Sequence, residues 1–204
     1  MFLISKKNAL RAVCLLSATF GFSTAYANET KFEITPFAGY MVSSDLQEYD
    51  SSTDISVDAG PNFGIGFAWQ DTPKGQGQIL INYVSHDFSG AEGTQDGSVD
   101  IIYTHFNGIA QFRQNAYVTT VSMGLGAGFF DTDASSEVYP SFTAAIGTRY
   151  EFSDAFAFIT ELRTYASLVD EDKNSFCKDD VCIAQYNGSL WYDTSLSVGL
   201  AFSF

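Results

Sequence analysis

The chain has 204 residues, of which 46% are hydrophobic, 16% aromatic and 17% charged, and its formal net charge is −14 at pH 7. A strongly acidic chain lacks the cationic surface that nucleic acids require, so nucleic acid is not expected as a partner. The many aromatic and few charged residues also argue against intrinsic disorder.

The first 27 residues predict a secretory signal peptide. Cations at positions 6, 7 and 11 precede an apolar stretch over residues 12–22, and Ala25-Tyr26-Ala27 supplies a small-x-small cleavage site. A retained membrane anchor would need about 20 apolar residues, more than this stretch offers. Cleavage after Ala27 leaves residues 28–204 as one domain, with seven Lys and Arg against 24 Asp and Glu.

Regular alternation of apolar and polar residues dominates the rest of the chain. It is clearest over residues 55–69, where every odd position from Ile55 to Trp69 is apolar, and it recurs over residues 117–129, 142–152, 156–168 and 190–204. A period of two predicts strands with two chemically different faces. Three less regular strands are expected at 31–41, 77–86 and 101–113, where Phe37, Met41, Leu80 and Val84 fall on the polar face.

The connections between these eight segments alternate in length. Short turns are expected at 71–76, 114–115 and 153–154, and longer polar loops near 42–54, 87–100, 131–138 and 170–188. This alternation is typical of up-and-down membrane barrels, with both termini on the short-turn, periplasmic side. The predicted fold is all-β, an eight-stranded antiparallel up-and-down transmembrane β-barrel.

The composition of the two faces separates this fold from a soluble, lipocalin-like barrel. Central positions of the apolar face carry no charge, whereas these charged residues all have the opposite parity: Glu33, Asp58, Arg113, Arg149, Glu151, Glu161, Arg163 and Asp193. An apolar exterior predicts lipid outside, and strands in lipid must close into a barrel because open edges would leave backbone groups unsatisfied. The lumen of such a small barrel is filled by side chains. Aromatic residues near the short turns predict a girdle: Trp69, Phe112, Tyr117, Tyr150, Phe152, Phe156, Phe202 and Phe204.

The last strand, residues 196–204, alternates and ends on Phe204. With this ending the chain resembles the small outer-membrane β-barrel proteins of Gram-negative bacteria, the family that includes the transmembrane domain of outer membrane protein A and its short relatives. The resemblance covers essentially all of residues 28–204. It implies an outer-membrane location, and it implies that the assembly machinery of that membrane reads Leu200, Phe202 and Phe204.

Four charged residues, Arg149, Glu151, Glu161 and Arg163, lie on the inner face of two adjacent predicted strands. A three-residue turn would pair Phe152 with Phe156 and place Arg149 diagonal to Glu161. We expect an ion-pair network that plugs the lumen, because isolated charges there would be costly. The alternative is a gate whose ion pairs exchange partners to admit small ions.

Cys177 and Cys182 are close together in the last long loop. Outside the cytoplasm this spacing predicts a disulfide that shapes the loop tip. A metal site using both thiols is the weaker alternative, because nothing else resembles a zinc ligand set. We expect neither a metal nor a cofactor.

The predicted long loops are acidic. Lys173 and Lys178 are the only cations there, against Asp45, Glu48, Asp50, Asp54, Asp87, Glu92, Asp96, Asp131, Asp133, Glu137, Asp170, Glu171, Asp172, Asp179 and Asp180. The expected role is a solvated surface that contacts lipopolysaccharide and membrane lipids through bridging divalent cations. A specific calcium site is the alternative, although no loop has EF-hand spacing.

His86 and His105 are the only histidines, and Ser85-His86-Asp87-Phe88-Ser89 superficially resembles the histidine and serine of barrels that trim lipid A. The spacing matches no recognisable nucleophile motif. The sequence therefore favours a non-enzymatic, monomeric barrel with a structural or surface-interaction role. A narrow porin-like channel is the second hypothesis, and a lipid A-modifying enzyme is the third.

Overall fold

The computed structural model describes residues 31–49, 53–89, 96–114, 117–170, 176–178, 181–182 and 184–204. The predicted signal peptide lies outside these ranges, as do Asn115 of a predicted turn and the loop residues Asp50, Glu92, Glu171, Asp172, Lys173, Asp179 and Asp180. The described residues contain no helix that is long and apolar enough to cross a membrane.

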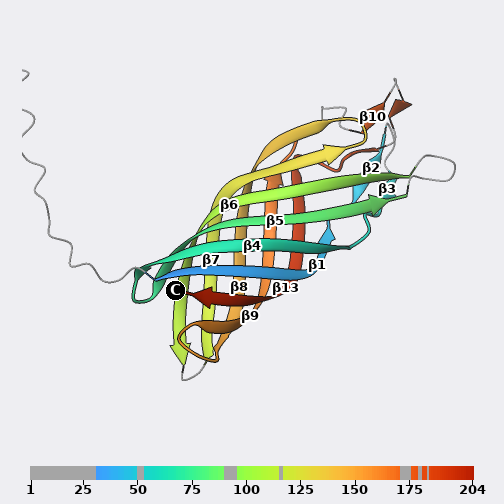
Figure 1. Ribbon diagram of the computed structural model, residues 1–204. Coiled ribbons are helices and arrows are strands. Elements are labelled where there is room, and N and C mark those ends of the chain that lie inside the picture. The colour runs from blue at the N-terminus through green and yellow to red at the C-terminus, as the bar shows by residue number, and fades with distance from the viewer. Residues whose placement is uncertain are drawn as a thin grey trace, which may run out of the picture.

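Eight long strands form one closed antiparallel barrel (Figure 1). They are β1 (Phe32–Ser43), β4 (Gly60–Thr72), β5 (Gly75–Phe88), β6 (Gly97–Gln114), β7 (Tyr117–Thr132), β8 (Ser136–Glu151), β9 (Phe156–Leu168) and β13 (Leu190–Ser203). Strands adjacent in the barrel order β1-β13-β9-β8-β7-β6-β5-β4 are hydrogen-bonded, and β1 pairs with β4 to complete the ring. The predicted eight-stranded up-and-down barrel is confirmed.

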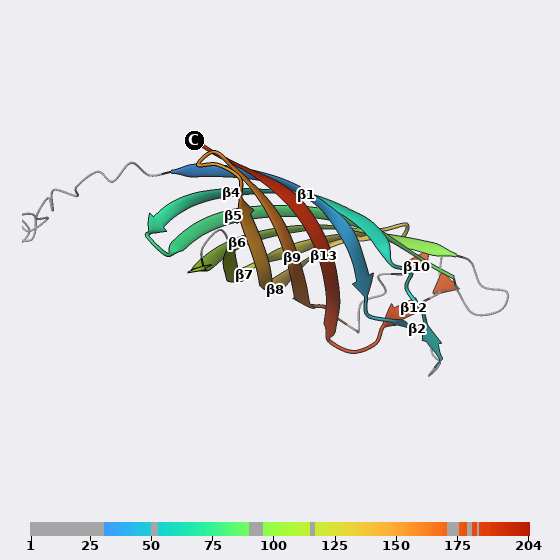
Figure 2. The same ribbon diagram turned by 90° about the horizontal axis from the view of Figure 1, so that it is seen from below.

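The seam between the first and last strands closes at the short-turn end. The Phe32 N–H donates to the Phe204 carbonyl at 3.0 Å, and the Phe204 N–H donates to the Phe32 carbonyl at 2.9 Å. Both ends of the folded barrel therefore meet on one rim, as Figure 2 shows for the C-terminus and β1.

Two predicted boundaries are wrong. Residues 131–138 form almost no loop, because β7 continues to Thr132, β8 starts at Ser136, and the Thr132 hydroxyl accepts hydrogen bonds from the N–H groups of Ala134 and Ser135. Such a side-chain cap stabilises a tight turn that alternation alone cannot reveal.

Residues 55–69 do not form one strand. Ile55 belongs to β3 (Asp54–Ile55), is 3% exposed and packs in the interior, whereas Phe63 of β4 is 57% exposed on the outer wall. β3 pairs with β2 (Leu46–Glu48), which pairs with β12 (Ala184–Tyr186). We call these three strands the cap sheet. The unbroken odd-position pattern across residues 56–59 therefore joins residues with opposite environments.

The outer wall is apolar around the whole barrel. Large side chains such as Met123, Leu125, Phe106 and Leu196 are 60–69% exposed. A protein in water rarely exposes contiguous apolar area beyond a few hundred Å². Seven of the eight predicted girdle aromatics are at least 37% exposed, and neighbours among them touch, as Tyr117 and Tyr150 do with ring centroids 5.2 Å apart. This wall is suited to lipid.

The irregular strands have a common explanation in the lumen. Met41, Leu80 and Val84 are at most 2% exposed and belong to the interior apolar cluster, and Phe37 packs against it. These side chains point into the lumen, as expected for positions that alternate with the apolar outer face. The interior of this barrel is therefore partly apolar, which made its strands harder to recognise.

Candidate functional site

The lumen is filled in layers, and the first layer lies at the short-turn end. Arg149 Nη1 lies 2.6 Å from Glu33 Oε2, with their side chains 9% and 7% exposed, and Arg149 Nε lies 3.4 Å from Glu151 Oε1. Arg113 donates two hydrogen bonds to Glu151, and the Ser203 hydroxyl donates to Glu33 at 3.0 Å. These five residues form what we call the lower ion cluster, beside a vestibule of about 330 Å³.

A second charged layer surrounds Arg163, which is 2% exposed. Its Nε donates to Glu161 at 2.7 Å, and its two terminal nitrogens donate to the hydroxyls of Thr143 and Ser122 at 3.1 and 3.2 Å. Every nitrogen of this buried cation therefore has a partner, which offsets much of the cost of its desolvation.

The four charges predicted as one network lie in two separate clusters. The predicted turn register is present, since Phe152 N–H donates to the Phe156 carbonyl and Arg149 lies opposite Ile159, but Arg149 pairs with Glu33 of β1. Barrel closure brings that carboxylate across the lumen from a strand 116 residues away. A prediction from one hairpin could not include it.

Amides form the layer between the charges and the outer half of the barrel. Asn62 donates to Asn82 at 3.1 Å, Asn82 donates to the Tyr165 hydroxyl at 3.0 Å, and Asn107 donates to Gln78 at 3.0 Å. A cavity of about 40 Å³ beside Gln78 has room for roughly three waters. Side chains therefore fill most of the lumen at this level.

Aromatic rings fill the outer half. The rings of Tyr103 and Tyr165 stack with centroids 4.2 Å apart, and Trp191 packs edge-on against Phe130 at 6.0 Å and Tyr186 at 5.8 Å. Each is at most 4% exposed, as is Tyr139. We call this group the aromatic plug: Tyr103, Phe130, Tyr139, Tyr165, Tyr186 and Trp191.

A buried polar group ties the plug to the wall. The Tyr103 hydroxyl donates to Asp193 Oδ2 at 2.5 Å, and Asp193 Oδ1 lies 3.5 Å from His86 Nε2. His86 Nδ1 lies 2.9 Å from the Asp58 carbonyl oxygen. Tyr103, His86 and Asp193 are 0% exposed, so this arrangement is positioned to hold β5, β6 and β13 together rather than to meet a substrate.

The predicted catalytic candidates are separated by the barrel wall. His86 faces the lumen, whereas its neighbour Asp87 is exposed on the opposite side of β5. His105 also faces the lumen and is 1% exposed. Neither histidine therefore lies on the lipid side.

The outer mouth is covered by the cap sheet, at the end of the barrel opposite the C-terminus (Figure 2). Leu46 and Ile55 point from it into the interior cluster, and Phe176 packs against Phe88 at 5.6 Å and Tyr186 at 5.2 Å. The described residues of the first and last long loops thus pack over the outer half of the lumen.

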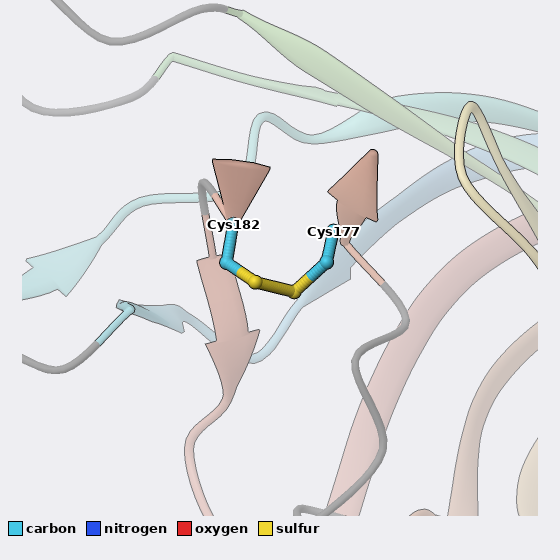
Figure 3. The surroundings of a disulfide bond; sticks show 2 residues. All are labelled: Cys177 and Cys182. Atoms are coloured by element: carbon cyan, nitrogen blue, oxygen red, sulfur yellow. A yellow bond between two sulfur atoms is a disulfide. The ribbon is translucent and has the colours of Figure 1, made fainter. Parts of the chain in front are cut away.

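The predicted disulfide between Cys177 and Cys182 is confirmed, and it joins β10 (Cys177–Lys178) to β11 (Val181–Cys182) (Figure 3). It begins directly after the buried Phe176. The bond therefore restricts the segment that carries Phe176 into the cap.

Replacing both cysteines by serine is expected to loosen this hairpin without unfolding the barrel. A ring this small contributes roughly 2 kcal/mol, and only to the local segment. Limited proteolysis should cut the double variant near residue 177 faster than the wild type, while the urea midpoint of the barrel stays within error. If the urea midpoint instead fell by an amount equivalent to roughly 2 kcal/mol, the hairpin would unfold together with the barrel as one cooperative unit.

The plug and its polar tie were not identified from the sequence. Alternation predicts that Asp193 lies on the inner face, but it does not indicate which inner aromatic rings pack together. The sequence does contain an indication of the plug. Several strands, including those of Phe130 and Tyr139, have an inward-facing aromatic residue in the half nearest the long loops.

A closed eight-stranded barrel with an apolar wall, a polar and charged lumen and aromatic girdles is a transmembrane β-barrel of the bacterial outer-membrane class. The fold is shared with solved structures, of which two are similar to it as follows. Outer membrane protein OprG from Pseudomonas aeruginosa has a TM-score of 0.59 and 12% identity over 85% of this chain and 95% of its own. Neisserial surface protein A has a TM-score of 0.54 and 11% identity over 85% and 97%. No protein-family model matches the sequence, and no curated protein is recognisably similar to it.

The class of this protein therefore follows from its fold and from its location in the outer membrane. It is a small outer-membrane β-barrel protein, and the identities of 11–12% carry nothing beyond the fold.

Proposed function

We propose that this protein is a plugged, non-enzymatic barrel that acts at the cell surface through its outer mouth. The observation that supports it best is the closure of the lumen by the aromatic plug and the cap sheet above two ion clusters. With the short turns on the periplasmic side, the cap sheet and the disulfide hairpin face outward.

A channel would require several layers to open in series. An ion would have to separate Glu33 from Arg149, then Glu161 from Arg163, and then pass the stacked Tyr103 and Tyr165. Separating a buried ion pair leaves uncompensated charge at a cost of several kcal/mol. The filled lumen thus favours a surface role over conduction.

An enzyme acting on lipid A would need its catalytic groups on the lipid side or at an open mouth. His86 and His105 are 0% and 1% exposed inside the barrel. Their burial supports a non-enzymatic role, because a general base must reach its substrate.

The outward surface is acidic, and lipopolysaccharide is the partner we propose for it. Asp45, Asp54, Asp131 and Asp133 are exposed around the mouth. Both surfaces are anionic, so contact requires bridging divalent cations. Within the described ranges no three His, Cys, Asp or Glu residues are grouped to hold a metal ion, which favours cations shared with the lipid phosphates over a resident site.

Removing divalent cations is expected to weaken binding of lipopolysaccharide to the purified, refolded barrel. A loop variant with four changes to Asn, at Asp45, Asp54, Asp131 and Asp133, should bind lipopolysaccharide about tenfold more weakly. Each exposed charge contributes at most ~1 kcal/mol. Asp154→Asn, an exposed carboxylate at the short-turn end, is the control and should change nothing. Binding that persists in EDTA and in the loop variant would refute the cation bridge, and an absence of binding in calcium would refute lipopolysaccharide as the partner.

The assembly machinery of the outer membrane is the second proposed partner. Phe204 is 69% exposed at the closing seam, so its ring contributes little to packing. Phe204→Ala, which keeps both backbone hydrogen bonds of the seam, is expected to lower the amount of protein in the outer membrane several-fold in cells, while purified protein refolds with a free energy of unfolding changed by about 1 kcal/mol or less. Phe112→Ala, in the same girdle at 58% exposure, serves as the control. Equal losses in cells would contradict a role for the terminal residue.

A further inference from the structure

The apolar wall has one conspicuous gap at the short-turn end. Four adjacent outward positions carry only Gly or Ala, because Gly77 of β5 pairs with Gly108 of β6, and Gly75 pairs with Ala110. The missing side chains leave a depression of about 700 Å³. We call it the wall groove.

Large apolar side chains border the wall groove. Trp69 and Phe106 stand together on one side with centroids 5.7 Å apart, and Val121 and Met123 stand on the other. The Trp69 ring covers Gly77, since a Cβ there would lie 2.4 Å from it, but a Cβ on Gly108 would meet nothing within 4 Å. The floor at Gly108 is therefore open to a chain lying in the groove.

The mouth of the wall groove carries both signs of charge. Asp71 and Lys74, at the β4–β5 turn, are exposed and line it. The Lys74 carbonyl accepts from the Gln111 N–H, and Gly108 lies three residues before Gln111 on β6, which is roughly 10 Å along the strand at ~3.3 Å per residue. With strands tilted by about 40°, the groove runs from the depth of the lipid headgroups toward the middle of the hydrocarbon.

We propose that the wall groove binds one phospholipid of the periplasmic leaflet, a zwitterionic lipid with a primary ammonium in its headgroup. One acyl chain lies over Gly108 between Phe106 and Met123. Lys74 pairs with the phosphate and Asp71 with the ammonium. The leaflet follows from the orientation in the proposed function, but the binding itself does not depend on it.

A second depression on the wall shows what distinguishes the first. It has about 470 Å³ and is bordered by Leu125, Phe142, Ala144 and Ala166, with no charged residue in its lining. Lipid chains can cover it, but it offers nothing that recognises a headgroup. Met123 borders both depressions and Ala144 pairs with Met123, so the matched control is placed at the far side of this one, at Ala166 of β9.

The test is native mass spectrometry of the full barrel in detergent, titrated with phosphatidylethanolamine or phosphatidylglycerol. The wild type should retain one phosphatidylethanolamine and bind phosphatidylglycerol more weakly. Gly108→Leu should weaken retention about tenfold by filling the groove, and Lys74→Glu about fivefold by repelling the phosphate. Ala166→Leu should leave it unchanged. All variants are first shown to be folded by their mobility on unheated gels.

Three outcomes would overturn the proposal. These are retention unaffected by Gly108→Leu, an equal loss in Ala166→Leu, and a dimer that Gly108→Leu abolishes, which would assign the groove to a second copy. Lipopolysaccharide binding measured on the same variants separates the two proposals, because the outer mouth is at the other end of the barrel. A Gly108→Leu variant that loses phospholipid retention but keeps lipopolysaccharide binding would support the wall groove and leave the function proposed for the outer mouth unaffected.

Discussion

Glu33→Leu is expected to lower the free energy of unfolding by about 3–5 kcal/mol, because it removes the main counterion of a buried guanidinium. Arg149 is 8% exposed, and its Nη1 contacts both Glu33 oxygens at 2.6 and 2.8 Å. Glu151 is shared with Arg113 and reaches only Arg149 Nε at 3.4 Å. It cannot replace Glu33 without giving up its other partner.

The double variant Glu33→Leu with Arg149→Met supplies the control. Replacing both members of a buried pair by apolar residues is often neutral or stabilising by about 1–4 kcal/mol. Urea unfolding of the barrel in lipid vesicles, followed by the fluorescence of Trp69 and Trp191, would give both values. A double variant as unstable as the single one would show that Glu33 acts through something other than Arg149.

The sequence was sufficient to predict the barrel because side-chain direction alternates strictly along a strand. Phe63, Ile65 and Phe67 are all exposed on the wall, whereas Asn62, the residue directly before Phe63, is 0% exposed in the lumen. Charge was the most reliable guide to the inner face. Glu33, Arg149, Arg163 and Asp193 are all buried there.

The partners within the lumen could not be predicted in the same way. Parity states which face a side chain occupies, but it does not state which of the other strands it meets across the barrel. Arg149 meets Glu33 from β1, and Tyr103 meets Asp193, 90 residues away. These pairings depend on strand stagger and tilt, which the alternating pattern does not encode.

The cap sheet was missed for a related reason. Ile55 and Phe63 have the same parity, yet one is inside and the other outside because the chain turns between β3 and β4. Strands of two or three residues carry too little periodicity to be recognised. The closure of the mouth was therefore visible only in three dimensions.

Trp191→Ala is expected to destabilise the barrel by about 3–5 kcal/mol, the usual effect of removing a large buried aromatic ring. Trp191 is 2% exposed and contacts both Phe130 of β7, within the plug, and Tyr186 of the cap sheet. The cavity should also uncouple the cap, so proteolysis near residue 186 should accelerate. Phe112→Ala, whose ring is already 58% exposed, should show neither effect.

Even with the plug weakened, ions should not pass. In planar bilayers we expect no stepwise conductance from the wild type, with or without calcium, or from Trp191→Ala, because the layers around Arg163 and Arg149 remain in series below the plug. Exchanging Glu161 and Arg163 tests the gate directly, since a gate built from exchanging ion pairs would change its conductance when their charges are reversed. If the wild type conducts and this exchange alters its conductance, the protein is a channel. If the wild type, Trp191→Ala and the exchange variant all fail to conduct, the outer mouth is left as the place where the protein acts.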